Sequence, residues 1–107
     1  MIDAQTAVQE ARGLFNEGKF WHVHEALENV WRVASGDEKK LLQGLILAAA
    51  SLVHLEKQHQ DVCWRMMGDA LSRLEDQPAD YHGWDIARFR NHLQNCAAKR
   101  EWLSIQV

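Results

Sequence analysis

The stretch Leu41-Leu42-Gln43-Gly44-Leu45-Ile46-Leu47-Ala48-Ala49-Ala50-Ser51-Leu52-Val53-His54-Leu55 places apolar side chains almost all the way round a helix. A helix that is apolar on every side is surrounded by protein on every side. The stretch is also shorter than the roughly 20 apolar residues that are needed to cross a bilayer. It therefore predicts the central helix of a bundle, over about residues 38–57, and no membrane-spanning segment.

Four further segments carry apolar residues at helical spacing, two on each side of the central helix. Asp3 and Asp85 precede two of them and favour helix N-termini, and Asp37 is predicted to cap the central helix. Residues 77–84 are predicted as a loop, because they contain proline and glycine and show no alternating strand pattern. The expected fold class is all-α, a compact bundle of about five helices around the central apolar helix.

Length and composition favour a single soluble domain over residues 1–107. The net charge is −3 and the sequence has no basic block, so we expect no nucleic acid as a partner. The N-terminus lacks the basic and apolar regions of a signal peptide, which favours a cytoplasmic location. Cys63 and Cys96 have no metal-ligand spacing and are predicted to be reduced and buried.

Four polar residues interrupt the predicted apolar faces. His24 and Glu28 lie one turn apart on the second helix, and Gln43 and His54 share a face of the central helix. An unpaired polar group costs about 1–3 kcal/mol when it is buried. These side chains are therefore expected to form a polar cluster between the two helices.

One interpretation of this cluster is a metal site. The H-E-x-x-E pattern of residues 24–28 resembles the helical H-E-x-x-H zinc motif. His24, Glu28 and His54 would then hold a divalent metal such as zinc, and Glu25 would be the candidate base of a metal-assisted hydrolase.

Two other interpretations stay open. One is a structural network in which His24 pairs with Glu28 and His54 with Gln43. The other is a metal-free ligand pocket to which Gln43, Trp31 and Arg32 contribute. Five tryptophans and an apolar tail over residues 102–107 favour a noncatalytic module that binds a protein partner or a second copy of itself. Whether the protein is an enzyme stays undecided on the sequence.

Two runs, residues 15–32 and 42–54, together match the pattern of a known family. The matching positions are Phe15, Gly18, Phe20, His24, Glu25, Glu28, Trp31, Arg32, Gln43, Gly44 and His54. On these residues the chain resembles the small helical domain-of-unknown-function family 309. The resemblance implies an all-helical bundle with a central helix, and it implies no established activity.

The chain departs from that family's pattern at two places. His22 stands where the family usually carries Glu, and Gln58-His59 stands where Gly-Asn is common. Further along, Gly83-Trp84-Asp85 is similar to the Gly-x-Asp start of the family's last helix.

Overall fold

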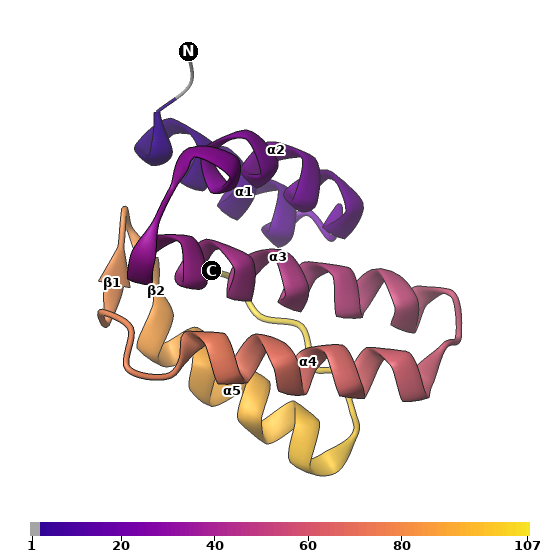
Figure 1. Cartoon of the computed structure of the whole chain (residues 1–107). Coiled ribbons are helices and arrows are strands. Elements are labelled where there is room, and N and C mark those ends of the chain that lie inside the picture. The colour runs from indigo at the N-terminus through magenta and orange to yellow at the C-terminus, as the bar shows by residue number, and fades with distance from the viewer. Residues whose placement is uncertain (1–2) are drawn as a thin grey trace.

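The computed structural model describes residues 3–107 and confirms the expected all-α bundle (Figure 1). Its helices and strands, in chain order, are α1 (Ala4–Asn16), α2 (Phe20–Val33), α3 (Gly36–Glu56), α4 (Gln60–Leu74), β1 (Asp80–Tyr81), β2 (Trp84–Asp85) and α5 (Ile86–Lys99). None of these helices is long and apolar enough to cross a membrane, within the residues described.

The central helix α3 lies between two helix pairs. Figure 1 shows α1 and α2 on one side of it and α4 and α5 on the other, and α3 makes contact with both α2 and α4. Its fully buried apolar side chains are Leu41, Leu42, Leu45, Ala48, Ala49 and Leu52. Burial on both sides explains why this helix is apolar almost all round.

Small residues bring α3 and α4 close together. A Cβ atom added at Gly44 would lie 2.8 Å from the Leu74 Cδ2 atom and 3.3 Å from the Ala70 carbonyl oxygen. Further along the same helix, the buried Ser51 donates a hydrogen bond of 2.6 Å to the Ala48 carbonyl oxygen. The small residues Gly44, Ala48 and Ser51 of α3 therefore let the backbones of α3 and α4 lie closer together than larger side chains would allow.

Two of the three predicted caps are present. Asp3 accepts a hydrogen bond of 2.8 Å from the Thr6 amide, and Asp85 accepts one of 3.0 Å from the Arg88 amide. The prediction that Asp37 caps the central helix is wrong. That helix begins at Gly36 with Ser35 at its N-cap, so Asp37 lies in the first turn, where its negative charge favours the helix dipole.

The predicted loop over residues 77–84 contains most of a small antiparallel hairpin, in which Tyr81 pairs with Trp84. The Tyr81 hydroxyl donates a hydrogen bond of 3.0 Å to Glu38 on α3, while Trp84 is fully buried. Burial, together with this hydrogen bond, holds the pKa of Tyr81 well above its ordinary value. The hairpin is thereby anchored to the first turns of α3.

The apolar tail packs back on the bundle. The Arg12 Nε atom donates to the Val107 carbonyl oxygen at 2.9 Å, and the Val107 amide donates to the Asn16 Oδ1 atom at 2.6 Å. On α5, Arg88 donates to the Gln106 carbonyl oxygen at 2.8 Å. Cys63 and Cys96 are free and buried, as predicted.

Candidate functional site

An apolar pocket of about 410 Å³ opens between α2 and α3. Its lining residues come from the first turns of α2, the second half of α3 and the residue after α3: Phe20, Trp21, His24, Ile46, Leu47, Ala50, Val53, His54 and Lys57. A volume of this size lies within the range of small-molecule and side-chain pockets. The ionisable groups in the lining are His24, His54 and Lys57, and none of them is a carboxylate.

Two of the predicted site residues meet at this pocket. His24 and His54 both line it, from different helices, and both are half-buried. Trp21 lies beside them with 58% of its surface exposed, and its ring meets the His24 ring edge-on at 5.8 Å. Two of the four polar residues that interrupt the apolar faces therefore lie at one pocket.

The third predicted metal ligand points elsewhere. Glu28 accepts a hydrogen bond of 2.7 Å from the Arg32 Nη2 atom, one turn further along α2. Across residues 3–107 no group of three or more His, Cys, Asp or Glu side chains is placed to hold a metal ion. The structure brings together two members of the His24, Glu28 and His54 set and pairs the third with an arginine.

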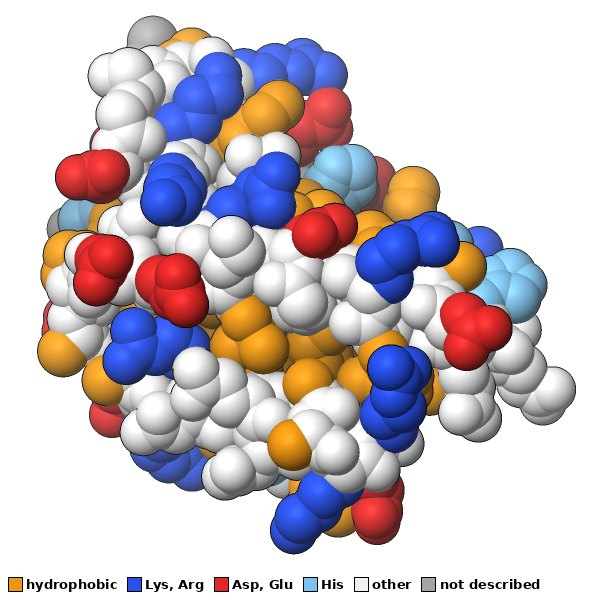
Figure 2. All heavy atoms as spheres, turned by 60° about the horizontal axis from the view of Figure 1, so that its bottom comes forward, with side chains coloured by type: hydrophobic (Ala, Val, Ile, Leu, Met, Phe, Trp, Pro, Cys, Tyr) orange, Lys and Arg blue, Asp and Glu red, His pale blue; other side chains and the backbone are white. Residues whose placement is uncertain are grey.

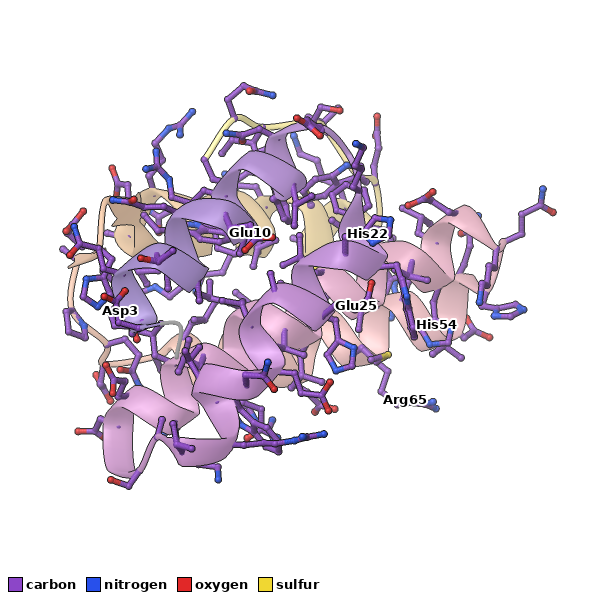
Figure 3. The ribbon with its side chains drawn as sticks, turned by 90° about the horizontal axis from the view of Figure 1, so that it is seen from above. Asp3, Glu10, His22, Glu25, His54 and Arg65 are labelled. Atoms are coloured by element: carbon purple, nitrogen blue, oxygen red, sulfur yellow. The ribbon has the colours of Figure 1, made fainter. Side chains whose placement is uncertain are left out.

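The other predicted site residues lie outside the pocket lining. Glu25 is exposed and accepts a hydrogen bond of 3.0 Å from His22 (Figure 3). The Lys39 Nζ atom lies 4.7 Å from the centre of the Trp31 ring. Arg32 is exposed, and Gln43 is half-buried on α3. The expected pairs of His24 with Glu28 and of His54 with Gln43 are not those the structure forms, since Glu28 bonds to Arg32 and His54 contacts His59.

Sequence reasoning missed Lys57, which lines the pocket, and the contact of His54 with His59, which lies outside the lining. The Nδ1 atoms of His54 and His59 lie 3.3 Å apart across the turn that joins α3 to α4. The signal in the sequence was a second histidine five residues after His54, just beyond the predicted end of the central helix at about residue 57. A histidine five residues after another cannot share its helix face, but a helix-ending turn brings the two together.

The face of the molecule that is drawn in Figure 2 carries mixed charge. On the face in Figure 2, Lys and Arg side chains are interspersed with Asp and Glu side chains, and hydrophobic side chains form a band across the middle.

A second hollow of about 310 Å³ adjoins the pocket between α2 and α3 and shares Phe20, Trp21, Val53 and Lys57 with it. The two hollows form one groove along α2 and the end of α3.

The sequence profile of a protein family described as "Domain of unknown function (DUF309)" matches residues 8–66, more than half of the chain. The chain belongs to this family. The matched DUF309 region includes every residue that lines the pocket between α2 and α3.

Two individual proteins are similar to the chain, one by sequence and one by structure. The chain is 28% identical over 95 residues to an uncharacterized protein of Aquifex aeolicus (strain VF5); the match covers 88% of the chain and only 28% of the length of that relative. A solved structure of a conserved hypothetical protein from Thermus thermophilus is 32% identical. It superposes with a TM-score of 0.76 over 92% of this chain and 99% of that one.

Proposed function

We propose that this DUF309 domain is a noncatalytic binding module that takes an apolar side chain of a partner protein into the pocket between α2 and α3. The observation that carries the proposal is an apolar pocket beside a tryptophan that is 58% exposed. Aromatic side chains at the edge of a pocket are typical anchors of protein interfaces.

The shape of the groove supports a peptide segment as its occupant. The main pocket continues into the second hollow through four shared lining residues, and the second hollow extends to Gly18. A groove of this form can hold successive anchor residues of a helix or an extended segment.

The charge of the pocket indicates what flanks the apolar anchor. Its ionisable lining residues are Lys57 and two histidines, with no carboxylate among them, and the adjoining hollow adds Lys19, His22 and one carboxylate, Glu56. A partner with an Asp or Glu beside its apolar anchor would place a negative charge near Lys57. We therefore expect an apolar anchor followed by an acidic residue.

Selection from a displayed library of random peptides tests this proposal. The variant Ala50→Arg fills the pocket with a charged side chain, and Gln94→Arg adds the same side chain at an exposed position on α5. We expect peptides selected on the wild-type protein to share an apolar anchor with acidic neighbours. Those peptides should bind Gln94→Arg normally and Ala50→Arg at least about tenfold more weakly.

The same selection gives the result that contradicts the proposal. If the recovered peptides bind Ala50→Arg as tightly as the wild type, the pocket is not the binding surface. Circular dichroism of both variants establishes that each keeps its helices. Because Trp21 is exposed, Trp21→Ala provides a second variant that weakens binding without removing core packing.

A further inference from the structure

We propose that His54 and His59 form a two-imidazole site for a divalent transition metal at the turn between α3 and α4. The Nδ1 atoms of the two rings lie 3.3 Å apart. Two nitrogens bound to one zinc ion at about 2.0–2.1 Å in tetrahedral geometry lie about 3.3–3.4 Å from each other. The pair therefore already has the spacing of two ligands on one metal ion. This site does not depend on the function proposed for the pocket.

The backbone of the turn fixes both histidines. The His59 amide donates to the His54 carbonyl oxygen at 2.9 Å, and the Gln58 amide donates to the Leu55 carbonyl oxygen at 2.9 Å. Gln58 between them has a φ of 63°, which completes the left-handed helix-ending motif. His59 is also the N-cap residue of α4, and its carbonyl oxygen accepts a hydrogen bond from the Cys63 amide at 3.0 Å.

This arrangement lowers the cost of binding a metal. Both ligands are carried by residues whose backbone is held by hydrogen bonds at the ends of two helices, so little backbone freedom is lost when the ion binds. His59 is exposed, which leaves the remaining coordination positions of the ion open to water. His54, which Figure 3 labels, is half-buried and lines the pocket between α2 and α3.

A hydrogen bond between the two rings is the competing explanation. The nitrogen–nitrogen separation of 3.3 Å is longer than the usual donor–acceptor distance of N–H···O bonds, about 2.9–3.0 Å. Such a bond also requires one Nδ1 atom to carry a proton and the other to lack it. A metal ion uses the lone pairs of both atoms at once and so suits two equivalent neutral imidazoles facing each other.

The chemistry of the donors selects the class of metal. Imidazole nitrogens favour Zn²⁺, Cu²⁺ and Ni²⁺ over the oxygen-seeking Ca²⁺ and Mg²⁺. Since the described residues place no third His, Cys, Asp or Glu at the pair, the chain supplies two ligands. The proposed ion is therefore held more weakly than in a closed structural site and keeps open positions.

Calorimetric titration of the untagged, metal-free protein with zinc chloride at neutral pH tests the site. We expect one zinc ion per chain, and binding at least about tenfold weaker in His54→Gln and in His59→Gln. The control is His82→Asn, at an exposed histidine of the hairpin with a φ of 49° that asparagine tolerates. It should bind zinc like the wild type.

A spectroscopic readout separates ligation from a change in stability. Zinc should shift the Nδ1 resonances of His54 and His59 in nitrogen NMR spectra, because both atoms would be ligands of the ion. Because His59 is exposed, His59→Gln keeps the fold even if His54→Gln loses stability. The proposal is overturned if His59→Gln binds zinc as tightly as the wild type, or if the two Nδ1 resonances stay unchanged.

Discussion

The side of α3 that faces α4 and the side that faces α2 both consist of small and apolar residues, but they differ in how tightly they are packed. The face towards α4 is closed, because a Cβ atom at Gly44 would lie 2.8 Å from Leu74 and Ala48 is fully buried. The face towards α2 is open beyond its middle, where Ala50 lines a pocket of about 410 Å³. One helix therefore serves both as the centre of the core and as a wall of the candidate site.

The difference shows that pocket formation here depends on the partner helix. On the closed face, Leu74 from α4 fills the space above Gly44. On the open face, α2 presents Trp21 and His24, whose rings pack edge-on against each other, with Trp21 turned largely to solvent. A small residue such as Ala50 leaves a hollow when no side chain from the facing helix reaches over it.

The strongest test of this contrast adds the same side chain to each face. Ala48→Leu puts three extra carbons into the closed face and should lower the free energy of unfolding by about 3 kcal/mol. Ala50→Leu puts the same atoms into the pocket and should change it by about 0.5 kcal/mol or less. Urea denaturation measures both values, and equal losses in the two variants would show that the open face is as tightly packed as the closed one.

A smaller change sharpens the description of the closed face. Gly44→Ala should lower the free energy of unfolding by about 1–2 kcal/mol, because the new methyl group meets Leu74 and the Ala70 carbonyl oxygen. The matched control is Gly68→Ala on α4, where a Cβ meets no atom within 4 Å. That variant should gain up to about 1 kcal/mol from helix propensity. A gain in both variants under urea denaturation would mean that α3 and α4 are not so close.

The smallest expected effect concerns the turn at the end of the open face. Gln58 adopts a φ of 63°, a conformation that side chains other than glycine, asparagine and aspartate rarely take. Gln58→Gly should therefore raise the free energy of unfolding by about 0.5–1 kcal/mol. Thermal unfolding followed by circular dichroism checks the sign. A lower melting temperature would indicate that the glutamine side chain stabilises the turn.

The helices could be predicted from sequence because each carries its own local signals. The spacing of apolar residues and the caps at Asp3 and Asp85 are properties of neighbouring residues, and the structure confirms them. The hairpin could not be found in this way, because strands of two residues are too short to show an alternating pattern. The fully buried Trp84 within it depends on contacts with distant parts of the chain.

The candidate site was predictable only in part, for a similar reason. Helical spacing identified the faces that carry His24 and His54, and the structure places both at one pocket. Spacing could not decide which neighbour each polar side chain chooses. Glu28 has His24 one turn before it and Arg32 one turn after it, and the charged guanidinium is the partner in the structure. The contact between His54 and His59 required the geometry of a turn rather than of a helix face.

The short connections between the first four helices bear on how the chain folds. Three residues or fewer separate α1 from α2, α2 from α3 and α3 from α4, and each of these pairs is in contact. Chains dominated by contacts between sequence neighbours lose little entropy in closing loops and fold within milliseconds or faster, on the order of the fastest small proteins. The two walls of the candidate pocket, α2 and α3, are such a neighbouring pair, so its formation requires the closure of a connection of two residues only.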